Sequence, residues 1–244
     1  MKRPLCGLLG ALALWWGAAL LVSSPLVLPG PGATFSRLAV LADASLAVSL
    51  LSSVGKVAAV LGIVVSIGVG LGMIFGLYPA FHDAFRPLLL AAQAMPVISW
   101  LALVVFAFGI GWRGPVFIAS LAFLPSAIFT TVAGVRSFER DLVEMADLYG
   151  VRGVRRWRDL YFGSLAPFMR AIVDTVSGGA WKAVLVAEYL CGGEGLGVRI
   201  AWARQMADVE GVYALSLLAV ILGLLGEWGI RMSLRRVRRR WMPS

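Results

Sequence analysis

Residues 135–170 read VRSFERDLVEMADLYGVRGVRRWRDLYFGSLAPFMR and form a charged interruption in an otherwise hydrophobic chain. The preceding segment, 114–135, contains no Asp, Glu, Lys or Arg, and apolar sequence resumes at Ala171. Charged side chains are costly inside lipid, whereas uncharged apolar stretches of this length are typical of membrane spans. The pattern therefore predicts a polar loop, residues 136–169, between two membrane-spanning helices.

The first half of this loop has the periodicity of an amphipathic helix. Leu142, Met145 and Tyr149 share one face. Charged residues fall mainly on the other face: Glu139, Arg140, Asp141, Glu144 and Asp147. Gly150 follows as a helix end, because glycine adopts a left-handed backbone conformation without a Cβ clash. A second apolar face follows: Val154, Trp157 and Tyr161. Two short helices around a glycine predict a docking element; the alternative is a solvated loop that only fixes the topology.

The spacing of Glu144, Ala146 and Gly150 resembles the EAA loop of ABC importer permeases. Two later positions hold conservative replacements of that motif: Leu160 and Phe162. Two positions depart from it: Met145 and Gly163. The similarity extends over about residues 78–228, through Gly109-Ile110-Gly111, Ala187-Glu188 and Gly195-Leu196-Gly197. The chain resembles the sulfonate/nitrate/taurine subgroup of these permeases, the inner-membrane components of binding-protein-dependent transport systems.

This resemblance implies an all-α, polytopic membrane protein with about six transmembrane helices, the type I ABC importer permease fold and a cytoplasmic coupling helix. It implies a permease subunit, not an enzyme, that pairs with a second copy and imports a small anionic organic solute such as a sulfonate, taurine or nitrate. Separate ABC ATPase subunits would bind ATP, an extracytoplasmic binding protein would deliver the solute, and the permease itself would need no cofactor. The implied ATPase-coupling residues are Leu142, Glu144, Met145, Ala146, Tyr149 and Gly150.

The composition independently predicts an integral membrane protein. The chain is 60% hydrophobic and only 14% charged, with a mean hydropathy of +0.87, whereas soluble domains carry about 25% charged residues. The net charge of +9 comes from loops and a basic tail, so membrane topology explains it better than a nucleic-acid partner does. Cys6 and Cys191 are too few for a disulfide framework or a metal site, and His82 is expected in a loop.

Six spans are predicted, at about 5–28, 57–81, 87–112, 114–135, 170–190 and 212–230. The first span follows a basic start, so a cleaved signal peptide is the alternative, and residues 35–53 are expected at the membrane interface. The whole chain, 1–244, is predicted as one permease domain. Its parts are 1–56 (first span and interfacial segment), 57–135 (spans two to four), 136–169 (docking loop), 170–230 (spans five and six) and 231–244 (basic tail).

Lysine and arginine counts predict the orientation. With the amino terminus inside, sixteen of these residues fall in inner segments and four in outer ones. Both termini and the docking loop are therefore expected in the cytoplasm, with the protein in the cell (inner) membrane.

Small residues recur every four positions in the second predicted span. One series is Gly68, Gly72 and Gly76, and another is Gly62, Ser66 and Gly70. Such spacing lets another helix approach closely in lipid. Gly55-Lys56 does not form a phosphate-binding loop, because the preceding glycine and the following Ser or Thr are missing.

The fifth predicted span carries two pathway candidates, Lys182 and Glu188. They are six residues apart, about 240° around a helix, so they do not form a pair on one helix face. The alternatives are an outer-interface position for Glu188 and an ion pair with another helix for Lys182. The glycine-rich segment 192–197, with the arginines after it, is expected outside as a gate or a contact for the binding protein.

A self-sufficient secondary carrier or channel for a small solute is the alternative function. Six spans without an evident internal repeat argue against a carrier built from inverted repeats, and the docking loop would then have no role. A membrane anchor for an enzyme has no support, because the sequence contains no catalytic constellation.

Overall fold

Every regular element is an α-helix in the computed structural model, which describes residues 2–137, 148–150 and 162–241. The helices are α1 (Lys2–Val22), α2 (Pro31–Leu41), α3 (Ala44–Leu77), α4 (Pro79–Ala94), α5 (Val97–Phe108), α6 (Arg113–Arg136), α8 (Phe162–Cys191), α9 (Leu196–Gln205) and α10 (Val209–Trp241). The predicted all-α class is confirmed.

Three of the described helices are long and apolar enough to cross a membrane by themselves: α3, α6 and residues 209–230 of α10. The bent pair α4–α5 provides a fourth span if it counts as one. The apolar part of α1, Leu9–Val22, is shorter, and α8 is 30 residues long but carries Asp174, Lys182 and Glu188. The six predicted spans correspond to α1, α3, α4–α5, α6, α8 and α10.

The helix that contains the second predicted span begins before that span. Residues 35–53 are divided between two helices, because α2 ends at Leu41 and the 34-residue helix α3 starts at Ala44. Asp43 causes this early start: its carboxylate accepts a hydrogen bond from the Leu46 amide at 2.7 Å and caps the helix. At 1.5 Å per residue α3 is about 50 Å long, so it extends beyond the hydrocarbon of a bilayer.

The third span also differs from the prediction. His82 lies within α4, not in a loop, where it is buried and packs edge-on against Phe129 of α6. The apolar run that follows breaks at Pro96, which starts a new helix, α5. Proline favours such a break because it lacks a backbone N–H and restricts the residue before it.

The helices that contain the last two predicted spans extend beyond these spans. α8 begins at Phe162, so residues 162–169 belong to this helix and not to a loop. α10 continues to Trp241, so most of the basic tail extends the last span as helix.

The core lies where α3, α6 and α8 pack together. Gly68, Gly72 and Gly76 of α3 face Ala127, Thr131 and Val135 of α6, four residues apart on both helices. A Cβ atom at Gly68 would lie 2.7 Å from that of Ala127, so only glycine permits this close approach. The second series, Gly62, Ser66 and Gly70, is exposed. The structure therefore confirms helix packing for the first series only.

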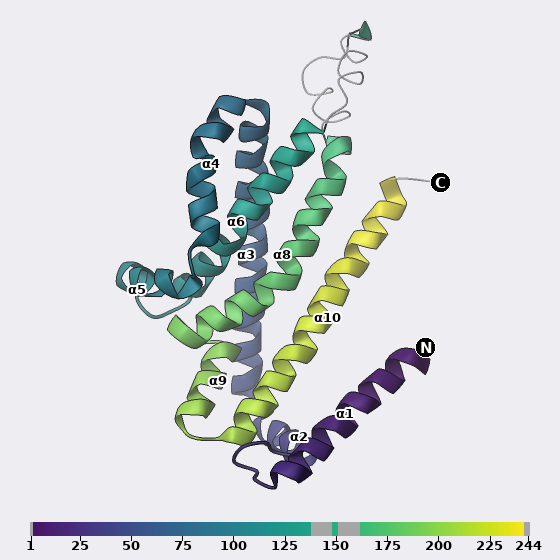
Figure 1. Cartoon of the computed structure of the whole chain (residues 1–244), viewed down its shortest axis with the longest axis vertical. Helices are drawn as coiled ribbons and strands as arrows, with labels where there is room; N and C mark the ends of the chain where they lie inside the picture. The colour runs from purple at the N-terminus through teal and green to yellow at the C-terminus, as the bar shows by residue number, and fades with distance from the viewer. Residues whose placement is uncertain (1, 138–147, 151–161, 242–244) are drawn as a thin grey trace.

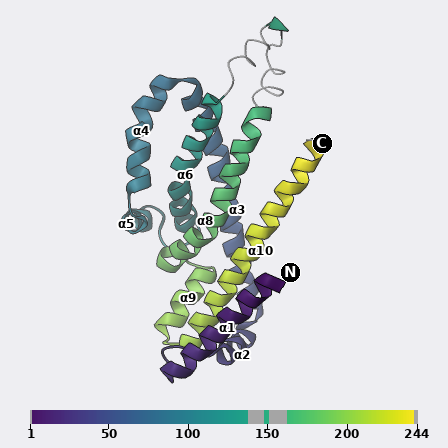
Figure 2. The same ribbon diagram turned by 45° about the vertical axis from the view of Figure 1, so that its right-hand side comes forward.

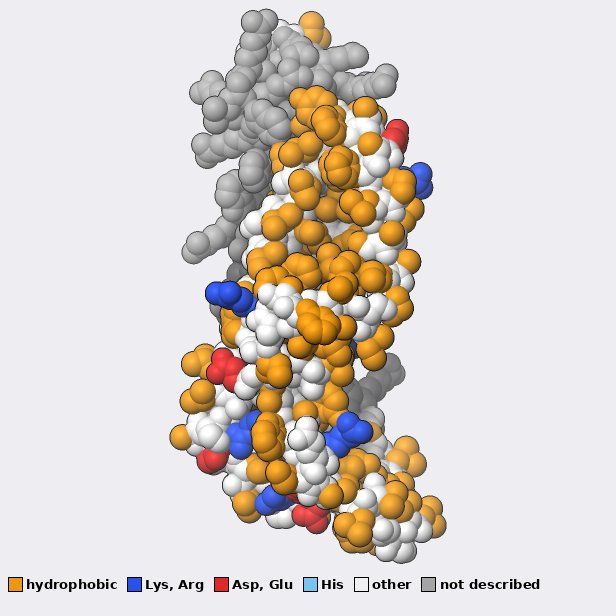
Figure 3. Space-filling model, turned by 90° about the vertical axis from the view of Figure 1, so that its left-hand side faces the viewer, with side chains coloured by type: hydrophobic (Ala, Val, Ile, Leu, Met, Phe, Trp, Pro, Cys, Tyr) orange, Lys and Arg blue, Asp and Glu red, His pale blue; other side chains and the backbone are white. Residues whose placement is uncertain are grey.

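The helices form an elongated bundle with two distinct ends (Figure 1). At the "loop end", α6 ends and α8 begins; at the opposite "α9 end" lie α9, α2 and the first turns of α3 and α10 (Figures 1 and 2). The face seen in Figure 3 is largely hydrophobic, with charged side chains gathered toward the α9 end. This distribution suits a bundle that is surrounded by lipid along its length and meets water at its ends.

Candidate functional site

The docking loop follows α6 and precedes α8 at the loop end (Figure 1). Four of the predicted coupling residues lie outside the described residues: Leu142, Glu144, Met145 and Ala146. Gly150 has φ +66°, which confirms the predicted left-handed conformation. The side chains of Leu148 and Tyr149 are 86% and 79% exposed, so apolar surface beside this glycine is uncovered in the single chain.

Lys182 and Glu188 lie on different sides of α8, as their spacing predicts. Lys182 is exposed, on a stripe with Ala171, Thr175 and Val186. No hydrogen bond or ion pair joins the Lys182 side chain to any residue that the structure describes. Glu188, by contrast, is 1% exposed and turned into the bundle.

Glu188 forms a buried ion pair with Lys56 of α3. The Lys56 Nζ and Glu188 Oε1 atoms are 2.7 Å apart, and both side chains are fully buried. The sequence prediction missed Lys56 as a partner of Glu188. The sequence did contain a signal for this pair. A lone lysine in so apolar a helix needs a negative or polar partner inside the protein.

Every polar atom in this buried pair has a partner. The ammonium group of Lys56 donates to Glu188 Oε1, to Ser52 Oγ at 3.0 Å and to the Glu194 carbonyl at 2.6 Å. The Glu188 carboxylate also accepts from Ser53 Oγ and from the Gly197 amide at 2.9 Å. A buried charge pair is stable only with such complete hydrogen bonding.

The same cluster caps helix α9. Ser53 Oγ accepts from the Leu196 amide at 2.8 Å and Glu188 accepts from Gly197, so two free amides of the first turn of α9 are satisfied by other helices. The negative carboxylate also lies at the positive end of the α9 dipole. We call these residues (Ser53, Lys56, Glu188, Leu196 and Gly197) the "α9 clamp".

The glycines of segment 192–197 fit around the α9 clamp. Gly195 has φ +125°, and a Cβ at this position would collide with the Glu188 carboxylate. A Cβ at Gly197 would collide with the Leu185 carbonyl, and one at Gly192 would lie 2.7 Å from the Glu188 carbonyl. The glycine-rich segment therefore provides close approach to Glu188.

Two partly exposed ion pairs join other elements at the α9 end. Arg37 of α2 contacts Asp208 at 2.6 Å, and Arg199 of α9 contacts Asp43 at 3.4 Å. The hydrogen bond from Arg37 and the Gly211 amide hold the pKa of Asp208 below its usual value. The Leu46 amide and the Ser45 hydroxyl lower the pKa of Asp43. Both carboxylates are therefore charged at neutral pH and cap the helices that follow them.

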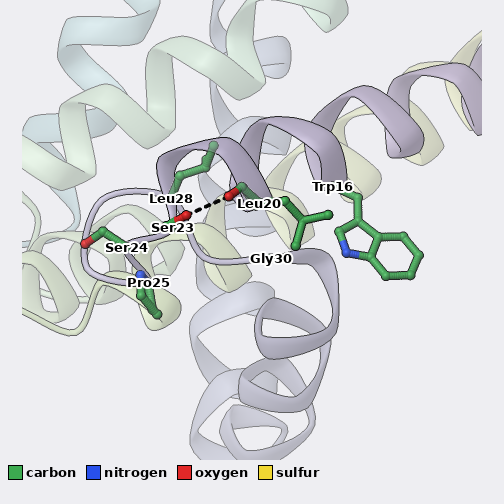
Figure 4. A pocket seen from close by; sticks show the side chains of 8 residues that line it. Trp16, Leu20, Ser23, Ser24, Pro25, Leu28 and Gly30 are labelled. Atoms are coloured by element: carbon green, nitrogen blue, oxygen red, sulfur yellow. Dashed lines mark hydrogen bonds between the residues drawn. The ribbon is translucent and has the colours of Figure 1, made fainter.

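A shallow cavity of about 300 Å³ lies between the end of α1 and the turn that follows it (Figure 4). Its lining includes Trp16, Leu20, Pro25 and Leu28 and no charged side chain. This lining does not provide the charged groups that an anionic solute needs. The part of the chain that the structure describes also contains no cluster of His, Cys, Asp or Glu suited to a metal ion.

Comparison with known proteins places this geometry in a family. Residues 67–239 match the family described as "Binding-protein-dependent transport system inner membrane component". The chain is 27% identical over 234 residues to a taurine transport system permease protein of Escherichia coli, covering 93% of this chain and 85% of the relative. It is 34% identical over 168 residues to a riboflavin transport system permease protein of Chloroflexus aurantiacus, covering 67% and 60%. A nitrate import permease protein of Synechocystis is 21% identical over 183 residues, covering 75% and 66%.

Proposed function

This chain belongs to the binding-protein-dependent transport system inner membrane components, and we propose that it forms the solute pathway of an ATP-driven importer together with a second copy of itself. The observation that carries the proposal is the family match, which spans residues 67–239 and so covers both the docking loop and the helices around it. The chain is a permease subunit, and the taurine and nitrate relatives support its place in the sulfonate/nitrate/taurine subgroup.

The energy for transport comes from partner ATPase subunits that bind the docking loop. The exposed side chains of Leu148 and Tyr149, next to the left-handed Gly150, support this role because uncovered apolar surface of this kind favours a protein contact. The loop end and both termini then face the cytoplasm, as the excess of lysine and arginine there favours. The binding protein approaches the α9 end.

The solute moves between the two permease copies along the exposed stripe of α8. A lysine in a membrane span has a high cost unless it meets water or a partner, and the exposed Lys182 on this stripe has no partner among the described residues. Two copies place two such lysines along one pathway. We therefore propose a small solute that carries an anionic group, such as a sulfonate, taurine or nitrate. The riboflavin relative indicates that family members differ in their solutes.

Substitutions in the docking loop test the coupling to the ATPase. We expect Gly150→Pro and Glu144→Lys each to lower ATP-dependent uptake about tenfold or more while membrane insertion persists. Proline holds φ near −65° and cannot adopt the left-handed conformation of Gly150. Uptake is measured in proteoliposomes that contain the ATPase, with binding protein supplied. Glu139→Lys makes the same charge change at the start of the loop and serves as the control. Normal uptake in both test variants, or uptake without any ATPase, would exclude the proposed coupling.

Substitution of Lys182 tests the anionic pathway. We expect Lys182→Met to lower the uptake rate at limiting solute concentration about tenfold, because the pathway loses its positive charge. Lys182→Arg keeps the charge and should retain most of the rate. The amount of assembled importer is measured in parallel, since the exposed side chain should not affect it. Equal uptake by all three proteins would remove Lys182 from the pathway.

A further inference from the structure

Helix α8 runs without interruption from the loop end to the turn that precedes α9. α8 starts at Phe162, next to the docking loop, and its last two turns carry Glu188 (Figures 1 and 2). After the short glycine-rich turn the chain continues directly into α9. A displacement of α9 can therefore reach the loop end along a single helix, provided that the junction between α8 and α9 is stiff.

The α9 clamp makes this junction stiff. It joins three elements through side chains that are fully buried, and its hydrogen bonds fix both the first turn of α9 and the Glu194 carbonyl of the preceding turn. The backbone at Gly192, Gly195 and Gly197 packs so closely against α8 that an added Cβ at any of these positions would collide with Glu188 or with the Leu185 carbonyl. A fully satisfied buried polar network of this type has one favoured arrangement.

α9 also presents an uncovered surface at its own end of the molecule. Trp202 and Met206 are 57% and 68% exposed, and Arg204 near them donates a hydrogen bond to the Tyr189 hydroxyl of α8 at 2.8 Å. A protein that approaches from this end meets α9 before it meets the core of the bundle. Exposed aromatic, methionine and arginine side chains are the types enriched in protein interfaces.

We propose that Lys56 and Glu188 are positioning residues that make α8 and α9 one rigid unit, through which contact of the binding protein with α9 is transmitted to the loop end. This inference rests on the proposed importer function. Both residues act through α9, because neither is exposed to solute or to a partner. They differ in this from Lys182, which lies on the open stripe of α8.

A role in stability alone makes a different prediction. An apolar pair of similar size can replace a buried ion pair without loss of stability, and a merely structural pair would then be dispensable. A positioning pair would not be dispensable, since leucine at 188 cannot accept the hydrogen bonds from the Gly197 amide and the Ser53 hydroxyl, and methionine at 56 cannot donate to the Glu194 carbonyl. The test variant is therefore Lys56→Met combined with Glu188→Leu.

The complete importer, with its ATPase and binding protein in nanodiscs, provides the measurement. We expect the double variant to assemble and to keep its basal ATP hydrolysis within about twofold, and to lose at least about fivefold of the stimulation by binding protein, a typical size for coupling between sites. Arg37→Gln with Asp208→Asn removes a pair that joins α2 to the turn between α9 and α10 and should leave the stimulation unchanged. Full stimulation of the double variant would overturn the proposal. If the unmodified importer is not stimulated at all, the proposed function fails instead.

A milder variant covers the case in which the double variant does not assemble. Ser53→Ala keeps the ion pair but removes the hydroxyl that accepts from Leu196 and donates to Glu188. We expect this variant to assemble and to lose about half of the stimulation. Unchanged stimulation in an assembled Ser53→Ala importer would argue against the proposal.

Chemical cross-linking provides a rescue. Ser52 Oγ and Glu194 Oε1 are 2.9 Å apart near the surface of the clamp, so a short thiol cross-linker should join Ser52→Cys to Glu194→Cys in a background with Cys6→Ala and Cys191→Ala. We expect the cross-link to restore stimulation to the double variant and to leave the otherwise unmodified importer active. Loss of uptake in that importer would show that the junction must open, which would also overturn the proposal.

Discussion

Removing one member of the Lys56–Glu188 pair is expected to destabilise the protein by about 3–5 kcal/mol, because the remaining charge is then buried without an opposite charge beside it. The relevant variants are Lys56→Met alone and Glu188→Leu alone. The two charges are 2.7 Å apart and inaccessible to water, so neither can be solvated when the other is lost. Thermal unfolding of the purified protein in detergent measures the effect.

The double variant distinguishes a charge effect from simple loss of packing. Combining Lys56→Met with Glu188→Leu removes both charges, so we expect most of the lost stability to return. Lys182→Met removes one charge from the exposed stripe of α8 and should change stability by less than about 0.5 kcal/mol. Single variants as stable as the unmodified protein, or a double variant whose loss equals the sum of the two single losses, would contradict a coupled buried pair.

The α9 clamp shows why this site could not be read from the sequence. Lys56 and Glu188 are separated by 132 residues, and many polar groups in the chain could have served either of them. The spacing of Lys182 and Glu188 correctly predicted that they occupy different sides of α8. Only the packing of α3 against α8 determines which of these sides is buried, and this depends on contacts far apart in the chain.

The helical class and the positions of most long helices were predictable, because they depend on local composition and periodicity. The left-handed Gly150 was predictable for the same reason, since it ends an amphipathic pattern. The start of α3 was missed because the capping role of Asp43 was not recognised before a long apolar run. The helical position of His82 was missed because a polar stretch was read as a loop, although its side chain packs against Phe129 in the folded chain.

The two glycine series of α3 provide the second prediction with a large effect. We expect Gly72→Leu to destabilise the protein by about 3 kcal/mol, at the upper end of the cost of overpacking a core. A Cβ at Gly72 would overlap the Thr131 side chain and lie 2.9 Å from the Ile128 carbonyl, and α6 cannot retreat without breaking the core. Thermal unfolding in detergent and the yield of folded protein from membranes both measure this loss.

Gly70→Leu is the matched control, because it makes the same chemical change two residues away on the same helix. A Cβ at Gly70 meets no other atom within 4 Å, so the side chain enters open space and the single chain should keep its stability. Equal damage from both substitutions would mean that helix propensity, not helix packing, accounts for the glycines of α3. If Gly70→Leu leaves the chain folded but prevents two copies from pairing, the exposed series of small residues lies at the contact between the copies. The two glycine series would then have separate roles, one within the bundle and one between bundles.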